Sequence, residues 1–135
     1  MSDTERKYTD FGYELVRETL LPELLNEEED EIMYWGGKLI ARKHPLDSVD
    51  DIPSFFERAG WGSLSLIKDS KKQSTFELHL MEDEKRALFS RYLEAGFIAA
   101  QYEWLFGVAA ETVIEKKRRK LRLHVHIDPT NDRRS

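Results

Sequence analysis

The sequence predicts an α+β fold in which N-terminal helices pack on a four-stranded antiparallel sheet. Two observations predict it. Apolar residues recur every three or four positions up to about residue 59, then alternate with polar ones over residues 61–81 and again over 108–127. Short turns join the strands within each alternating stretch, and one helical segment separates the two stretches. The element order is therefore helices, strand, strand, helix, strand, strand, which implies two hairpins in one sheet with helices on one face.

The N-terminal half predicts three helices. Apolar spacing begins a helix near residue 9, Pro22 interrupts it, and a short continuation stops at Asn26. Five acids at 27–31 favour the first turn of a second helix, which ends near His44 because the next residue is proline. Its predicted buried side consists of Ile32, Trp35, Leu39 and Ile40. The third helix is predicted over 53–59, closed by Gly60.

The C-terminal half predicts the sheet. The first hairpin turns at 69–72, between strands that contain Leu64, Leu66, Phe76, Leu78 and Leu80. The helix that follows carries Phe89, Leu93, Phe97, Ala100 and Trp104 on one face and ends at Gly107. The last two strands are predicted over 108–116 and 121–127, around a basic turn at 117–120.

Composition places the chain among single-domain cytoplasmic proteins. Its 135 residues suffice for one hydrophobic core, so we expect a single domain over 1–135 with frayed tails at 1–7 and 128–135. The absence of cysteine excludes disulfides, thiol catalysis and thiolate metal sites, and fits a reducing compartment. The chain has no apolar run of about 18 residues and no apolar stretch near Met1, so we expect neither a membrane span nor a signal peptide.

Charge is distributed unevenly along the chain. Residues 1–31 hold eleven acids and three bases, whereas residues 115–135 hold eight bases and three acids. Three interpretations remain open: a nucleic-acid patch at the basic end, pairing with a second copy through complementary fields, or two solvated faces of a monomer. Lys116–Lys120 is predicted to be a solvated hairpin tip, and we expect no nucleic-acid binding, since the protein is acidic overall.

Motifs for metal, cofactor or hydrolytic chemistry are weak. His124 and His126 leave the same face of one strand, a spacing found in metal sites, but they lie beside Arg122 and the basic turn, so we expect no metal. Gly60-Trp61-Gly62 does not continue as a dinucleotide-binding loop, and no nucleophile elbow is present. Glu94 and His79 are the one candidate acid–base pair, and nothing in the sequence brings them together. We therefore expect no enzymatic activity and no cofactor.

The aromatic residues are more informative. Trp35, Phe56, Trp61, Phe97 and Trp104 fall on predicted inward faces, and tryptophans that need an acceptor for the ring N–H often line pockets. Gly36-Gly37 within a helix costs about 2 kcal/mol relative to two alanines, so a backbone or a ligand comes close there, with close packing favoured. The predicted ligand-binding residues are Trp35, Gly36, Phe56, Trp61, Phe97 and Trp104.

Five tracts of the chain match the pattern of a known family: Phe11–Arg17, Leu20–Leu25, Tyr34–Lys38, Phe55–Gly62 and Leu93–Phe97. Through them the chain resembles the YslB-like family of uncharacterised bacterial proteins. The family is distantly similar to the superfamily of the 4-vinyl reductase domain and the small TRAPP subunits. That resemblance implies helices on a four-stranded antiparallel sheet, a homodimer, and relatives that either hold small apolar ligands or build complexes. Some 4-vinyl reductase domains carry metal-binding cysteines, which this chain lacks.

Two functions follow as hypotheses. The first is a non-catalytic module that binds a small apolar or aromatic ligand in a pocket between helices and sheet. The alternative is a homodimeric assembly or scaffold protein with a filled interior. In that case Tyr8, Leu20, Leu24 and Met33 would form an exposed apolar patch. Whether the interior is hollow or packed discriminates between them.

Overall fold

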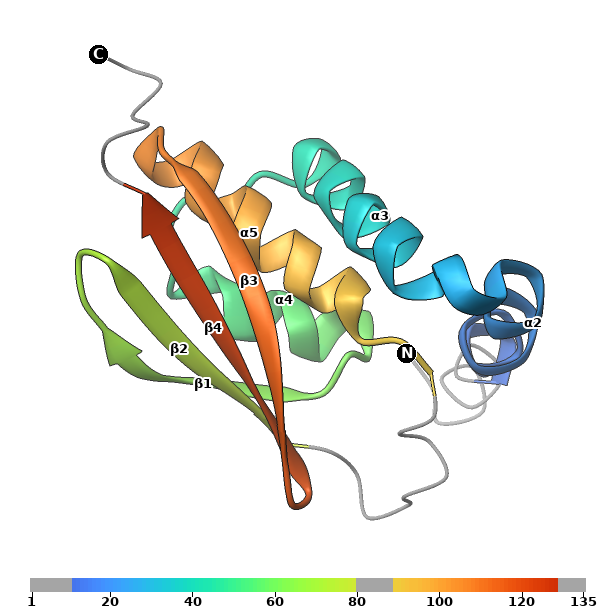
Figure 1. Ribbon diagram of the computed structural model, residues 1–135. Coiled ribbons are helices and arrows are strands. Elements are labelled where there is room, and N and C mark those ends of the chain that lie inside the picture. The colour runs from blue at the N-terminus through green and yellow to red at the C-terminus, as the bar shows by residue number, and fades with distance from the viewer. Residues whose placement is uncertain (1–10, 80–88, 129–135) are drawn as a thin grey trace.

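The computed structural model describes residues 11–79 and 89–128 and has the predicted α+β class (Figure 1). A four-stranded sheet forms one side of the molecule, and helix α5 (Tyr92–Phe106) lies between this sheet and helix α3 (Glu29–Lys43). Helix α4 (Asp51–Ala59) covers the sheet beside α5, near strand β1 (Ser63–Asp69). No helix within the described residues is long and apolar enough to cross a membrane.

The N-terminal helical region is divided where proline was expected to interrupt it. Residues 11–14 are helical and lead into a π-helix, η1 (Leu15–Leu20), followed by α2 (Leu21–Leu25), with Pro22 in its first turn. Leu20 and Leu21 keep right-handed helical dihedrals and the Leu21 N–H donates to the Val16 carbonyl, so the chain stays helical from η1 into α2 although Pro22 has no N–H to donate. Asn26, at φ 49°, begins the 3₁₀ turn η2 (Asn26–Glu28) that leads into α3 (Glu29–Lys43).

The other two helices end at the predicted glycines. Helix α4 (Asp51–Ala59) stops at Gly60, with φ 75°, and α5 (Tyr92–Phe106) stops at Gly107, with φ 65°. Both glycines adopt the left-handed conformation that ends helices at little cost only in residues without a Cβ.

The sheet consists of two hairpins joined through β2 and β4. Its strands are β1 (Ser63–Asp69), β2 (Gln73–His79), β3 (Ala109–Lys117) and β4 (Lys120–Asp128). Their order is β1-β2-β4-β3, and every neighbouring pair is antiparallel. Leu64, Phe76, Leu78, Leu121, Leu123 and Val125 are buried beneath the helices. Asp128 is the last residue of β4, so it does not belong to a frayed tail as predicted. Residues 129–135, the predicted tail 1–7, Leu80 and Met81 lie outside the described residues.

Helix α5 is more deeply buried than its sequence suggested. Its neighbours are α3 on one side and the sheet on the other, so most of its circumference is covered, as expected for a helix that is apolar all round. Gln101, fully buried, accepts a hydrogen bond from the Leu46 N–H (3.0 Å) and donates to the His44 carbonyl (2.9 Å). These bonds fix the end of α3 to α5 and satisfy backbone groups that would otherwise be unpaired.

Candidate functional site

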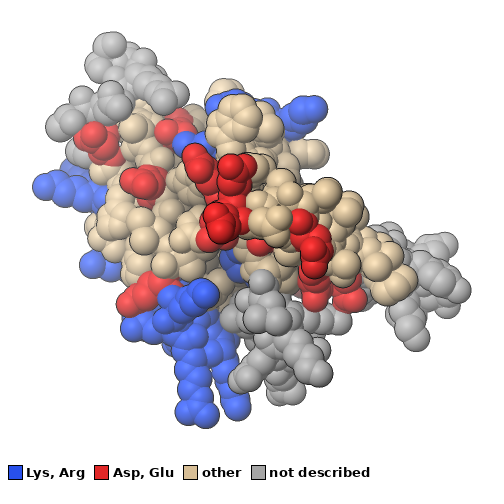
Figure 2. Space-filling view, turned by 45° about the vertical axis from the view of Figure 1, so that its right-hand side comes forward, with Lys and Arg blue, Asp and Glu red and all other residues tan. Residues whose placement is uncertain are grey.

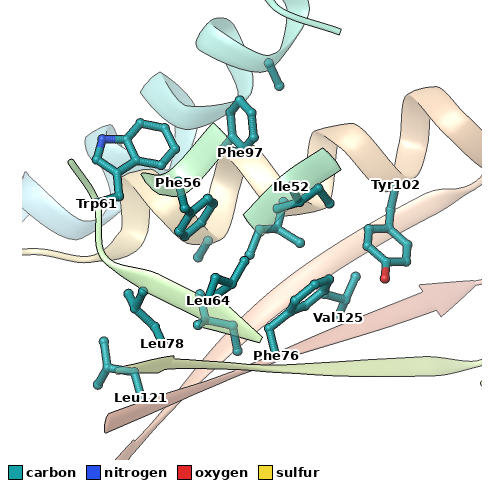
Figure 3. Close-up of a cluster of buried hydrophobic side chains, with 14 of the residues drawn as sticks. Ile52, Phe56, Trp61, Leu64, Phe76, Leu78, Phe97, Tyr102, Leu121 and Val125 are labelled. Atoms are coloured by element: carbon teal, nitrogen blue, oxygen red, sulfur yellow. The ribbon is translucent and has the colours of Figure 1, made fainter. Parts of the chain in front are cut away.

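Three of the predicted ligand-binding residues meet in the core. Phe56, Trp61 and Phe97 are buried, and Figure 3 shows them grouped between the helices and the sheet. Their ring centroids lie 5.0 Å (Phe56–Trp61), 5.2 Å (Trp61–Phe97) and 6.2 Å (Phe56–Phe97) apart, all in edge-on geometry. That geometry is favoured between aromatic rings. The three rings therefore pack directly on one another and fill the space between them.

Trp35 and Trp104 are not inward-facing, and this part of the prediction is wrong. Trp35 is 64% exposed on α3 and Trp104 is 66% exposed on α5. The six predicted residues therefore do not form one site. On α3 the buried face is not the predicted one. Met33, Gly37 and Ala41, spaced four apart, form the buried face. Ile32, Trp35 and Leu39 are exposed. Hydrophobicity indicated the wrong face because the buried face is built from smaller residues.

The glycines explain that choice of face. A Cβ at Gly37 would lie 2.7 Å from the Phe97 backbone nitrogen and closer still to the Leu93 carbonyl oxygen. A Cβ at Gly96 would lie 2.8 Å from the Tyr34 carbonyl carbon and closer still to its oxygen. At Gly36 the nearest atom would be Leu93 Cδ1, at an ordinary 3.6 Å. The expected close packing is thus present, at Gly37 and Gly96 rather than Gly36.

The outer face of α3 is an exposed apolar stripe with opposite charges at its two ends. We define it by Ile32, Trp35 and Leu39, all exposed. Glu28 and Glu31 lie at its N-terminal end and Arg42 and Lys43 at its C-terminal end, also exposed. These positions share one helix face by their spacing of three and four. On the preceding helices Leu20 and Leu24 are exposed as predicted, whereas Met33 is buried and Tyr8 lies outside the described residues.

A buried ion cluster anchors the N-terminal region to the start of α5. Glu94, fully buried, accepts from Arg17 and from Arg91 (2.9 Å). Arg17, 2% exposed, also donates to the Tyr13 hydroxyl (2.6 Å) and the Ser90 carbonyl (2.9 Å). The candidate pair of Glu94 with His79 does not form, since Glu94 is held by two arginines. The signal that could have located this cluster is a lone carboxylate in an otherwise apolar stretch of α5.

The face of the sheet that points away from the helices is polar and carries several ion pairs. His124 is hydrogen-bonded to Thr75 (Nδ1 to Oγ1, 3.0 Å) and to Glu115 (Nε2 to Oε1, 2.9 Å). Glu115 also pairs with Lys117 (3.2 Å), and these hydrogen bonds hold the pKa of Glu115 below its usual value. Among residues 11–79 and 89–128, no group of three or more metal-binding side chains is arranged to hold an ion.

The basic tip predicted at Lys116–Lys120 lies at the end of the β3–β4 hairpin, and its residues 116–119 are exposed, as predicted. The β3–β4 connection is a two-residue turn, Arg118 and Arg119, with Arg119 at φ 64°. Lys120 is paired with Glu77 (3.2 Å). Figure 2 shows acidic side chains gathered near the middle of one face and basic side chains projecting from its lower edge. Side chains of like charge are thus grouped on this face of the folded protein.

Comparison with known proteins identifies relatives. Residues 10–128 match the model of the family described as "Protein of unknown function (DUF2507)". The "Uncharacterized protein YslB" of Bacillus subtilis (strain 168) is 40% identical over 115 residues, which cover 81% of this chain and 76% of that protein. The expected resemblance to the YslB-like family is therefore confirmed.

Solved structures resemble the fold more remotely. A mutant of the Fe(II) unliganded H-NOX protein from K. algicida gives a TM-score of 0.48 over 73% of this chain, and the match spans 63% of that chain. Subunit 3 of the trafficking protein particle complex from Naegleria fowleri, covalently bound to palmitic acid, gives 0.43 over 91% of this chain and 92% of that chain. Both are 11% identical to this chain, and at these TM-scores neither likeness bears on function.

Proposed function

This chain belongs to the DUF2507 family, and on that premise we propose that it is a non-catalytic assembly protein of the cytoplasm that forms a homodimer through the outer face of α3. The observation that carries the proposal is Trp35, 64% exposed at the middle of an ordered helix between Ile32 and Leu39. Three large apolar side chains in one exposed stripe are typical of a surface that a partner covers. The packing of Phe56, Trp61 and Phe97 supports this hypothesis over a ligand held among them.

The charges at the ends of the stripe favour a second copy in antiparallel orientation. Helix α3 has 15 residues, about 22 Å, and Trp35 and Gly36 lie at its midpoint. A two-fold axis there would place Ile32 of one copy opposite Leu39 of the other. It would also bring the acidic start of each helix to the basic end of its partner. Such an interface is self-complementary in both shape and charge, as two-fold symmetry requires.

The test compares two variants that each introduce a glutamate at an exposed apolar residue, on opposite sides of the molecule. Trp35→Glu places a charge in the centre of the stripe, whereas Val113→Glu places one on the polar sheet face, where Val113 is also exposed. Sedimentation velocity at micromolar concentration should give a dimer for the unaltered chain and for Val113→Glu, and a folded monomer for Trp35→Glu. A monomeric unaltered chain, or a Trp35→Glu variant that remains dimeric, would contradict the proposal.

A charge exchange tests the antiparallel orientation. Glu28→Lys alone should weaken the dimer, because it faces the basic end of the partner helix, and Lys43→Glu alone should weaken it similarly. The double variant restores opposite charges across the axis and should recover the affinity. If the losses of dimer affinity in the two single variants simply added in the double variant, the antiparallel contact would be excluded, even if the protein is dimeric.

A further inference from the structure

The N-terminal arm, which we define as residues 11–25, carries its large apolar side chains on the outside. Burial along the arm repeats every four residues, with Tyr13, Arg17 and Leu21 buried or half-buried. The exposed positions between them carry five large apolar side chains, Phe11, Leu15, Val16, Leu20 and Leu24. Residues four apart drift around an α-helix, which turns in 3.6 residues. The wider π-turn of η1 offsets that drift, so the apolar side chains share one continuous face.

Polar groups attach the arm to the rest of the protein. Its only fully buried residue is Arg17, which is bonded to Glu94 and to the Ser90 carbonyl (2.9 Å). A surface helix normally presents its apolar side to the core and its polar side to solvent. The arm has the reverse arrangement, and its apolar face takes no part in the attachment. An apolar face of this kind is typical of a surface that a partner covers.

The stripe on α3 is small for a stable dimer interface. A large apolar side chain that is about half exposed offers on the order of 100 Å² to a partner, so the three of the stripe offer roughly 300 Å². A stable interface buries about 800 Å² on each partner, and somewhat more than half of this area is apolar. Leu20, Leu24 and Trp104, all exposed, offer about as much apolar area again. With them the surface reaches the size that a stable dimer needs.

An exposed basic and aromatic surface lies at the other end of α3. Gln101 of α5 donates to the carbonyl of His44 (2.9 Å), so α5 contacts the end of α3 one turn before Trp104. Trp104 is exposed, and so are Arg42 and Lys43 in the last turn of α3. We define Arg42, Lys43 and Trp104 as the C-terminal corner.

The exposed charge of the arm is opposite to that of the corner. Arg17 is the one base between residues 11 and 31, and it is buried against Glu94. Glu23, Glu27 and Glu28 are exposed where the arm leads into α3. The arm therefore presents apolar and anionic side chains, and the corner presents a tryptophan and two cations. Two such surfaces are complementary in both polarity and charge.

We infer that the arm of each copy covers the C-terminal corner of the other copy in the dimer. The inference rests on the proposed function, because the antiparallel pairing of α3 creates the contact. The arm lies at the start of α3 (Figure 1), and the two-fold axis brings that start to the end of the partner's α3. Leu20 and Leu24 then contact Trp104 of the partner subunit. The contact forms twice in each dimer.

Disulfide formation tests the contact directly, because the chain contains no cysteine of its own. Leu24→Cys and Trp104→Cys are combined in one chain. Within a copy these positions lie near opposite ends of α3, which is about 22 Å long, whereas a disulfide joins Cα atoms less than about 7 Å apart. The bond therefore forms only between copies. At about 10 µM the double variant should form a covalent dimer about a hundredfold faster than either single variant, as measured by non-reducing electrophoresis.

A second cysteine pair distinguishes this contact from the α3 dimer. Glu28→Cys combined with Lys43→Cys reports the pairing of α3 and involves neither Leu24 nor Trp104. A covalent dimer from this pair, with none from Leu24→Cys and Trp104→Cys, would overturn the arm contact and leave the α3 dimer in place. No covalent dimer from either pair would overturn both.

The affinity of the dimer provides an independent measurement. Leu24→Ser and Ile67→Ser each replace an exposed apolar residue, the first on the arm and the second on the sheet, so both variants should fold. Sedimentation over a range of concentrations should show a dimer at least tenfold weaker for Leu24→Ser, because the lost contact occurs twice. Ile67→Ser should not change the affinity. Equal affinities of the two variants would mean that something other than the second copy covers the arm, and would overturn the inference.

Discussion

Adjacent glycines in α3 should respond in opposite directions to the same substitution. In Gly37→Ala the new Cβ meets backbone atoms, which cannot rotate away: its distance to Phe97 N must grow from 2.7 Å to at least the 3.4 Å of ordinary contact. Helices α3 and α5 must therefore separate along their whole contact. Gly36→Ala meets only Leu93 Cδ1, at 3.6 Å, and needs no movement.

The magnitudes follow from two opposing terms. Overpacking of this kind costs about 3 kcal/mol, and replacing a helical glycine by alanine recovers up to about 1 kcal/mol. Gly37→Ala should thus lose about 2 kcal/mol of unfolding free energy, and Gly36→Ala should gain up to about 1 kcal/mol. For a domain of this size the difference corresponds to about 12 °C in Tm.

Urea and thermal unfolding of both variants at one protein concentration provide the assay. Because the two positions are neighbours in one helix, differences in helix preference cancel in the comparison. If Gly37→Ala proved as stable as Gly36→Ala, the close crossing of α3 and α5 would be refuted. The buried face of α3 would then have to be assigned again.

Two further predictions concern buried polar groups. Glu94→Gln should cost about 3 kcal/mol of unfolding free energy, because it leaves Arg17 buried without a carboxylate. Lys38→Met breaks the partly exposed pair with Glu103 (3.3 Å) and should cost less than about 1 kcal/mol. Equal losses of unfolding free energy in urea would contradict this difference. Burial raises the pKa of Tyr102 above 10.0. The unfolded chain therefore releases this proton first, and stability, complete below about pH 10, should fall as the pH rises above it. Tyr102→Phe should make that fall shallower, and identical slopes from pH 9 to about 11 would exclude the contribution.

The sequence predicted the elements well where the signals are local. Pro22 lies in the first turn of α2, Gly60 and Gly107 end α4 and α5, and period-two alternation identifies the strands β1 to β4. Each of these depends on the conformational limits of one residue or on side chains a few positions apart. Such signals are present whatever the rest of the chain does.

The candidate sites were predicted less well, because they depend on partners distant in sequence. Phe56, Trp61 and Phe97 were correctly predicted to be buried, but their mutual ring contacts could not be predicted. Arg17 and Glu94 meet only in the folded chain.

The sequence by itself determined the class of fold, the order of its elements and the separation of charge between its ends. Only the tertiary structure decided which face of α3 is buried. The reason is steric: Gly37 and Gly96 allow the backbones of α3 and α5 to approach closely, and that contact stabilises the small-residue face over the larger apolar one. Trp35 is left on the surface as a consequence, and the surface that we propose for assembly exists only because of that choice.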